Sequence, residues 1–288
     1  MKVGIDSYCF HRYFGEVYPY PGHVPLEKNW STSDFIKEAK ELGADGVNLE
    51  SCFLESLDDH YILDIKSELD SYNLERVIAW GHPTGLERGL NPEAYDEMIR
   101  LIPTSKLLGA DVMRITGSGA GWRFEDHKEQ IARLKPLLKE AAKIAKDNGV
   151  RLALENHHDF FADEILEMIE YVDSPYFGAN FDSGNFARML DDPVRAMELL
   201  KDYTFSTHLK DLKIDPSMPP NEWCFMACVP IGQGFVQMQK IVDILATTSF
   251  DGFIAVEIDY PHPDWTGREY EAVKQSIEGM RNLVKNIK

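Results

Sequence analysis

The strongest constraint on the fold is a regular alternation of short apolar runs with longer segments whose apolar residues recur at helical spacing. The runs typical of buried strands cover residues 3–8, 46–50, 74–80, 111–116, 150–155, 177–182, 204–208 and 253–257. Helical segments such as 31–43, 127–149 and 162–172 lie between them, and Gly43 and Gly149 are placed as C-terminal caps. This alternation, without a linker or a composition shift, predicts one α/β domain over residues 1–288, folded as a (β/α)₈ TIM barrel.

An open, doubly wound parallel sheet is the alternative arrangement for the same pattern. Such a sheet usually carries a glycine-rich phosphate-binding turn after its first strand. The first strand of this chain runs into "GIDSYCFHRYFG", which is not a turn of that kind. The barrel is therefore the predicted fold.

The charge and the cysteine pattern restrict the partners and the compartment. A formal net charge of −18 disfavours binding to a phosphate backbone, so we expect no nucleic acid partner. The segment "MKVGIDSYCF" lacks the long apolar stretch of a signal peptide, no apolar run is long enough to cross a bilayer, and the cysteines show no CxxC spacing. We expect a cytoplasmic protein with reduced thiols and no membrane partner.

Polar residues at the ends of the predicted strands indicate where the chemistry lies. In a TIM barrel the active site is built at the C-terminal ends of the strands and by the loops that follow them. The predicted strands end at or near Tyr8, Glu50, His82, Arg114, Glu155, Asp182, His208 and Glu257. One such residue alone is usually a salt-bridged rim residue, but packing does not account for polar side chains at so many strand ends.

Four of these residues predict a metal site. Glu155, Asp182, His208 and Glu257 end the last four strands, and adjacent strands lie about 5 Å apart, so the four side chains can converge. Three carboxylates and an imidazole would repel one another without a cation. Oxygen-rich ligand sets suit Mn²⁺, Mg²⁺ or Co²⁺, with Zn²⁺ as a further alternative. A network of rim ion pairs is the alternative without a metal.

The sequence around these residues is similar to that of a known family. The segments "LALENHHDF", "FGANFDSGNF", "TFSTHLKDLK", "VPIGQGFVQM" and "DGFIAVEI" resemble, in strand order, the xylose-isomerase-like TIM barrel superfamily and its sugar phosphate isomerase/epimerase group. The resemblance implies that Glu155, Asp182, His208 and Glu257 hold one divalent ion, for which we expect Mn²⁺. It also implies a small-molecule carbohydrate substrate. Because the family is often dimeric or tetrameric, a homo-oligomer is possible for this chain as well.

In this family, such a metal site has a catalytic role. A divalent ion chelated by the carbonyl and adjacent hydroxyl oxygens of a keto sugar acidifies the neighbouring C–H and stabilises an enediolate. The resemblance implies that Glu155 and Glu257 are the catalytic acid/base pair. We therefore predict a metal-dependent isomerase or epimerase of a keto sugar or related polyol. A lyase or dehydratase acting on a keto sugar or 3-keto-glycoside is the first alternative, and a non-catalytic sugar-binding barrel is the second.

Two positions depart from the pattern of the family's ketose 3-epimerases. A histidine commonly follows the metal-binding aspartate by three residues, where this chain has Asn185 in "DSGN". A glutamate that contacts substrate commonly follows the fifth strand, where this chain reads "NHHDF". We expect Asn185 to contact substrate and His158 to replace the glutamate as a hydrogen-bond donor or general acid, with His157 in a structural role.

Further residues are candidates for substrate contact. Lys210 has the same strand parity as the metal-binding histidine and is expected to point inward toward a substrate oxygen, whereas Asp211 is expected to cap or pair locally. His82 and Arg114 are assigned to substrate hydroxyls or a carboxylate. Trp122, in the glycine-rich segment "GSGAGWRFED", is expected to cover an apolar patch of the sugar from a loop that can move as a lid.

Phosphate chemistry has weak support in the sequence. The segment "PIGQGF", around Gly232 and Gly234, has the composition of a phosphate-binding turn, but a lone GxG motif is a weak signal. The superfamily also contains an apurinic-site endonuclease with three zinc ions. That enzyme needs a histidine at the position of Asn185 and a D-x-H motif where this chain reads "DLKID", so the sequence excludes the nuclease.

Overall fold

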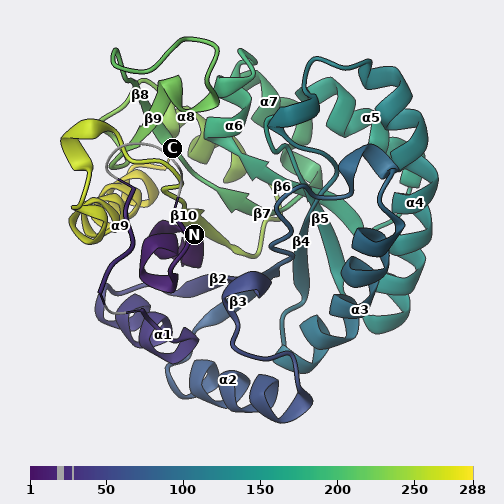
Figure 1. The fold of residues 1–288 in the computed structure, drawn as a ribbon, viewed down its shortest axis with the longest axis horizontal. Helices are drawn as coiled ribbons and strands as arrows, with labels where there is room; N and C mark the ends of the chain where they lie inside the picture. Colours follow the sequence, from purple (N-terminus) through teal and green to yellow (C-terminus); the bar gives the residue numbers. More distant parts are fainter. Residues whose placement is uncertain (18–22, 28, 288) are drawn as a thin grey trace.

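Eight parallel strands form the barrel that the sequence predicts. The computed structural model describes residues 1–17, 23–27 and 29–287. The barrel strands are β1 (Lys2–Asp6), β2 (Gly46–Glu50), β3 (Glu75–Ala79), β4 (Val112–Thr116), β5 (Arg151–Glu155), β6 (Phe177–Asp182), β7 (Thr204–His208) and β10 (Phe253–Val256), paired in the order β10-β1-β2-β3-β4-β5-β6-β7. Next to β7, Leu209 N donates to Ala255 O (2.7 Å) and Leu209 O accepts from Glu257 N (3.2 Å). This contact closes the ring of strands seen in Figure 1 and excludes the open sheet.

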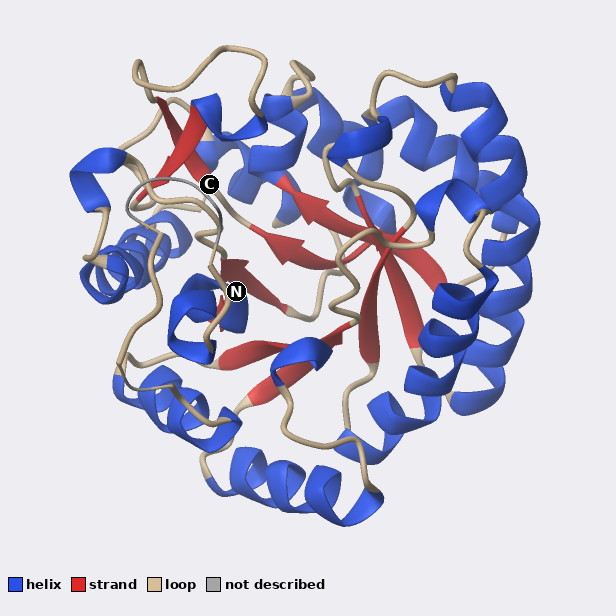
Figure 2. Cartoon of the chain, in the orientation of Figure 1, coloured by secondary structure: helices blue, strands red, loops and turns tan. Residues whose placement is uncertain are grey.

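Helices form the outer layer around the strands (Figure 2). The α-helices are α1 (Thr32–Glu41), α2 (Asp59–Ser71), α3 (Pro92–Leu108), α4 (His127–Asn148), α5 (Ala162–Val172), α6 (Ser183–Arg188), α7 (Pro193–Leu200), α8 (Met238–Leu245) and α9 (Glu269–Lys285). Short 3₁₀ helices are η1 (Ser7–Phe14), η2 (Ser51–Phe53), η3 (Glu87–Gly89), η4 (Ala120–Trp122), η5 (Lys201–Tyr203), η6 (Trp223–Phe225) and η7 (Pro263–Trp265). Ser31 caps the N-terminus of α1, and Gly149, at a φ of 69°, caps the C-terminus of α4, as the sequence predicts for this glycine. None of the helices in the described ranges has the length and apolarity that crossing a membrane requires.

Some boundaries differ from the sequence-based expectation. The first strand ends at Asp6 rather than at residue 8, because the Asp6 carboxylate accepts a hydrogen bond from Tyr8 N (2.6 Å) and caps η1. The third strand ends at Ala79, which leaves His82 in the following loop. An antiparallel hairpin of β8 (Asp211–Ile214) and β9 (Met226–Val229) was not predicted. It lies between β7 and α8 in the chain and is labelled at the upper left of Figure 1.

The alternation of side chains along each strand divides the barrel interior into levels. Along β5, the residues of one parity are Arg151, Ala153 and Glu155, so one face of this strand changes from basic to apolar to acidic. The middle level is a separate apolar cluster of Val77, Val112, Ala153, Phe253 and Ala255. A Cβ at Gly4 or Gly46 would lie 2.2 or 2.5 Å from the Phe253 ring, so this ring requires glycine at both positions. The apolar level lies between the two ends of the barrel.

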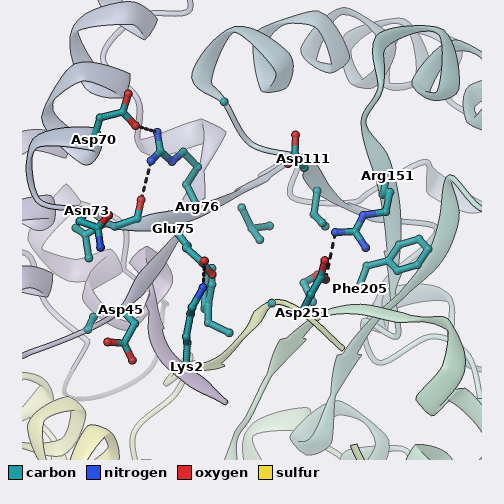
Figure 3. A pocket seen from close by; sticks show the side chains of 18 of the residues that line it. Lys2, Asp45, Asp70, Asn73, Glu75, Arg76, Asp111, Arg151, Phe205 and Asp251 are labelled. Carbon is teal, nitrogen blue, oxygen red and sulfur yellow. Dashed lines mark hydrogen bonds and ion pairs between the residues drawn. The ribbon is translucent and has the colours of Figure 1, made fainter. Parts of the chain in front are cut away.

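A polar cavity of about 750 Å³ lies at the N-terminal end of the barrel. Figure 3 shows that its basic side chains point toward carboxylates. The pairs are Arg76 with Asp70 (2.6 Å), Arg151 with Asp251 (3.6 Å) and Lys2 with Glu75. Each of these three cations is therefore balanced locally.

Candidate metal centre

Four buried side chains converge at the C-terminal end of the barrel. Glu155 ends β5, Asp182 ends β6, His208 ends β7 and Glu257 directly follows β10. One donor atom from each lies within 4.8 Å of the donor atoms of the other three. His208 Nδ1 is 2.6 Å from Glu257 Oε2, 3.0 Å from Glu155 Oε1 and 3.9 Å from Asp182 Oδ2. The structure thus brings together the four residues that the sequence proposes as metal ligands.

The backbone around Asp182 is held by neighbouring strand ends. Asn156 Nδ2 donates to Asp182 O (3.0 Å), and Asp182 N donates to Asn156 Oδ1 (3.1 Å). The Asp182 carboxylate also accepts from Asn185 N (2.9 Å), because Asp182 is the N-cap of α6. Ser183 Oγ exchanges hydrogen bonds with the backbone of Lys210 at 2.9 and 3.0 Å, which ties β6 to the end of β7. These contacts fix the direction of the Asp182 side chain.

Asp6 is a functional candidate that the sequence analysis missed. Its buried Oδ2 lies 3.0 Å from His208 Nε2, on the side of the imidazole opposite the carboxylates of Glu155 and Glu257. A proton on Nε2 and facing Asp6 would leave Nδ1 as the atom available to a metal. The signal was present in the sequence, since an aspartate stands in the first strand run, but the strand was expected to continue to residue 8.

Two buried cations offset part of the negative charge. Arg114 pairs with Glu50 and, at 3.1 Å from Nε to Oε2, with Glu155. Lys210 Nζ lies 2.7 Å from Asp182 Oδ2, 3.2 Å from Glu257 Oε2 and 3.1 Å from Asp259 Oδ2. Lys210 therefore points inward, as its parity predicts, but its ammonium group lies among carboxylates.

The electrostatics of the cluster depart from those of free side chains. Burial alone would lower the pKa of His208, but Glu257, Glu155 and Asp6 outweigh it and hold that pKa well above its ordinary value. Burial opposes ionisation of Glu155, yet Arg114 and His208 hold the pKa of Glu155 well below its usual range. For Asp182, burial dominates over Lys210 and raises the pKa to about 7. The neighbouring cations therefore compensate the burial of Glu155 but not that of Asp182.

The donor set fits a divalent cation. Glu155 Oε2 and Glu257 Oε2 are buried, and no contact in the described part of the chain gives either of them a hydrogen bond of good geometry. Their neighbours are ion-pair partners: Arg114 Nε lies 3.1 Å from Glu155 Oε2, and His208 Nδ1 lies 2.6 Å from Glu257 Oε2. Buried carboxylate oxygens without a donor are costly unless a cation takes the donor's place. Three carboxylates and one imidazole are the ligand types preferred by borderline and hard divalent ions. The four residues can therefore hold one such ion.

A cavity of about 660 Å³ adjoins the cluster, within the range that small ligands use. Glu257 lines this cavity. Of the residues predicted to contact substrate, His82, Arg114, Trp122 and His158 line it as well. Asn185 and Lys210 are not among the lining residues, and Lys210 Nζ lies 3.3 Å from Asn185 Oδ1 and 2.7 Å from Asp182 Oδ2. Their contact with substrate stays a prediction.

His158 is held in a defined protonation state. Arg188 Nη1 lies 3.3 Å from His158 Nε2, and because a guanidinium only donates, Nε2 accepts and the proton sits on Nδ1. Burial, and then the charge of Arg188, lower the pKa of His158 well below its ordinary value. The neutral ring stacks on Trp223, with centroids 5.3 Å apart. This geometry favours His158 as a hydrogen-bond donor over His158 as a general acid.

Arg188 and Asp259 were not identified as functional candidates from the sequence, and both lie beside Trp223, one of the five tryptophans expected on the active-site side of the barrel. Arg188 donates to Asp259 with an Nη2–Oδ1 distance of 2.8 Å and lies over the Trp223 ring, 4.9 Å from its centroid. Asp259 and Trp223 line the cavity beside Glu257. Asp259 has the parity of Glu257, which is a usable signal, whereas the approach of Arg188 from α6 depends on tertiary packing.

Comparison with solved structures shows the same fold. The structure of the IOLI protein with a binding zinc atom matches 100% of this chain and 99% of that chain, with a TM-score of 0.77 and 17% sequence identity. The structure of D-psicose 3-epimerase with D-tagatose from Clostridium cellulolyticum H10 matches 100% of each chain, with a TM-score of 0.72 and 16% identity. Both similarities concern the architecture described above.

Sequence comparison adds the family. An inosose dehydratase of Bacillus thuringiensis (strain Al Hakam) is 22% identical over 217 residues, which cover 68% of this chain and 72% of the relative. The sequence model of the xylose isomerase-like TIM barrel family matches residues 36–283, from α1 to α9. Because the family model matches most of the chain and the strands close into a barrel, the chain belongs to the xylose isomerase-like TIM barrel family.

Proposed function

We propose that the protein is a divalent-metal-dependent isomerase or epimerase of a keto sugar or related polyol, working through an enediolate. The observation that carries the proposal is the convergence of the buried side chains of Glu155, Asp182, His208 and Glu257 beside a ligand-sized cavity. The family supports it, since the relatives of this chain include an inosose dehydratase and a structural neighbour is a D-psicose 3-epimerase.

The four converging residues would hold the metal. We expect Mn²⁺, with Mg²⁺, Co²⁺ or Zn²⁺ as alternatives, because the ligand set is rich in oxygen and lacks thiolates. A bound divalent ion supplies a Lewis acid that makes the C–H beside a ketone more acidic. Asp182 and His208 serve as ligands, with His208 offering Nδ1 and Asp6 facing its Nε2.

Glu257 would exchange a proton with substrate. It is the member of the cluster that lines the cavity, and its Oε2 lies 3.2 Å from Lys210 Nζ. Burial disfavours its ionisation, but Lys210 and His208 lower the pKa of Glu257 below its ordinary value, so the carboxylate is available as a base. Glu155 is the second member of the pair. Proton return to the opposite face of the same carbon gives epimerisation, and return to the adjacent carbon gives isomerisation.

Residues around the cavity would orient the sugar. Trp122 and Trp223 offer aromatic surface to the C–H faces of a sugar ring. His158 offers the Nδ1–H donor, and His82 offers a further polar side chain. Arg114 keeps Glu155 ionised through its ion pair, so its main contribution is to the acid/base pair rather than to substrate.

A metal-dependent lyase or dehydratase is the second candidate, and Glu50 favours it. Glu50 lines the cavity and shares the Arg114 guanidinium with Glu155. Burial, together with the nearby carboxylates of Asp6 and Glu257, outweighs the effect of Arg114 and raises the pKa of Glu50 to about 8, so this carboxyl is mostly protonated at neutral pH. A protonated carboxyl beside the substrate can deliver a proton to a departing hydroxyl. The similarity to an inosose dehydratase agrees with this alternative.

Deuterium exchange tests the proposal and separates the candidates. The Mn²⁺-loaded protein is incubated in D₂O with a panel of ketoses and keto-glycosides, and the products are followed by NMR. Exchange at the carbon beside the ketone without loss of water indicates an isomerase or epimerase. An unsaturated or dehydrated product indicates the lyase. Absence of exchange and of product across the panel, with metal bound, would contradict both and favour the non-catalytic sugar-binding barrel.

A further inference from the structure

We infer that this site is selective for a neutral, non-phosphorylated sugar or polyol and discriminates against sugar phosphates and sugar acids. The inference rests on the proposed function and specifies its substrate class. Two independent observations carry it. One is the charge of the cavity lining, and the other is the occupation of the turn that would bind a phosphate.

The cavity lining is acidic. Glu16, Glu50, Glu257 and Asp259 line it, and Arg114 is the one Arg or Lys side chain among the lining residues that the structure describes. Arg114 is already paired with Glu50 and Glu155. A phosphate or carboxylate on the substrate would therefore meet the carboxylates of Glu16, Glu257 and Asp259 without an available guanidinium or ammonium partner, and like charges at close range repel one another.

The turn with phosphate-binding composition is filled from within the protein. TIM barrels frequently bind phosphate in the loops after the last two strands, where backbone N–H groups point at the anion. Residues 230–236 follow β7 and its hairpin and occupy that position in the chain. The buried Asp211 carboxylate takes the place of the anion, with Oδ2 accepting from Gly232 N and Gly234 N at 2.8 Å each.

Both carboxylate oxygens of Asp211 accept hydrogen bonds from backbone N–H groups. Its Oδ1 accepts from Val236 N (3.1 Å) and from Leu212 N (3.0 Å), so four backbone donors are used. A Cβ at Gly234 would lie 2.2 Å from Asp211 Oδ1, which explains the glycine at that position. The backbone N–H groups of the two glycines in "PIGQGF" thus bind the Asp211 carboxylate. These contacts do not support the hypothesis that this segment binds phosphate.

Three further cations near the cavity are paired with carboxylates. Lys210 faces Asp182, Glu257 and Asp259. Arg188 is paired with Asp259, and Arg88, which lies over the Trp122 ring, is 2.7 Å from Glu125. The lining instead offers neutral groups, including the indoles of Trp122 and Trp223. Aromatic faces with neutral donors suit the C–H and hydroxyl groups of an uncharged sugar.

Matched substrate pairs test the inference. D-Fructose is compared with D-fructose 6-phosphate, and D-ribulose with D-ribulose 5-phosphate, by C–H exchange in D₂O and by calorimetric titration of the Mn²⁺-loaded protein. We expect the neutral member to be preferred by about tenfold or more in kcat/KM or in Kd. Preference for a phosphate ester in either measurement overturns the inference and leaves the proposed function standing. Exchange absent from both members of both pairs counts against the proposed function, and the titration then decides the inference alone.

A charge variant provides a second test. Glu16→Gln removes one carboxylate from the lining, and Glu129→Gln removes one from the exposed surface of α4 as a matched control. We expect Glu16→Gln to shift the ratio of phosphate-ester to neutral-sugar binding toward the ester by about threefold or more. Glu129→Gln is expected to leave the ratio unchanged. Equal ratios in the wild-type protein and in Glu16→Gln would contradict an electrostatic origin of the selectivity.

Discussion

The two ends of the barrel are both polar and both hollow, but they handle charge in opposite ways. At the N-terminal end, Arg76 faces Asp70, Arg151 faces Asp251 and Lys2 faces Glu75, around a cavity of about 750 Å³ (Figure 3). At the C-terminal end, the cavity of about 660 Å³ is smaller, and carboxylates converge on His208 rather than on separate cations. Cavity size therefore does not distinguish a site from a structural cavity here.

Burial explains why the difference matters. Asp70 is about half exposed, and its ion pairs with Lys66 and Arg76 lower its pKa, as expected for a solvated pair. Asp182 is fully buried, and its pKa is raised to about 7 although Lys210 lies 2.7 Å away. Paired surface charges contribute little to stability, whereas a buried carboxylate is stable only when a proton or a cation neutralises it. This contrast favours the C-terminal end as the candidate functional site.

Glu257→Gln is expected to have the largest effect. Removing the carboxylate that lines the cavity takes away the base, so C–H exchange should fall by about 10²- to 10⁴-fold. The amide keeps the size of the side chain and one oxygen for a metal, so part of the metal affinity should remain. Glu75→Gln, at the opposite end of the barrel, is the matched control and should exchange at the wild-type rate. Wild-type exchange in Glu257→Gln would contradict its role.

Asp6→Asn tests whether the Asp6 carboxylate positions the imidazole of His208. Loss of the carboxylate beside Nε2 removes a partner that orients the imidazole, so metal affinity should fall by about 10- to 100-fold. Isothermal titration with Mn²⁺ measures the change, and circular dichroism of the metal-free variant checks that the barrel is intact. An unchanged Kd in a folded variant would show that Asp6 does not position the ligand.

The pH dependence of stability should differ with and without metal. The pKa of Asp182 rises from an ordinary 3.8 to about 7 on folding, so the metal-free protein loses stability as pH rises through this interval. The raised pKa of His208 acts in the same direction at higher pH. A cation binds the ionised carboxylates, so the rise in Tm on adding saturating Mn²⁺ should be larger at pH 8 than at pH 5.5. Equal rises in Tm would contradict this assignment.

Arg76→Gln should have the smallest effect and sharpen the comparison. It breaks an ion pair with the half-exposed Asp70, so the free energy of unfolding should fall by about 1 kcal/mol or less. Thermal unfolding measures this change, which should be a few degrees at most. The Mn²⁺ affinity should equal that of the wild-type protein. A large loss of metal affinity would mean that the two ends of the barrel are coupled.

Much of this organisation follows from local sequence patterns. The strands and the four converging residues were predicted because buried parallel strands have distinctive runs and because their ends must meet at one edge. The hairpin of β8 and β9 was not, since its strands are only four residues each and depend on pairing across a long loop. Asp6 was missed because the first strand was predicted to end at residue 8, two residues beyond its actual end. The contact of Arg188 with Asp259 joins residues 71 positions apart and required the folded chain.

Metal titration of the wild-type protein tests the central claim most directly. Protein stripped with a chelator is titrated with Mn²⁺ by calorimetry, and the bound metal is counted by elemental analysis after desalting. The account predicts one ion per chain, a rise in Tm on binding, and loss of both in Asp182→Asn combined with His208→Gln. Absence of stoichiometric binding by the folded wild-type protein to Mn²⁺, Mg²⁺, Co²⁺ and Zn²⁺ would contradict it.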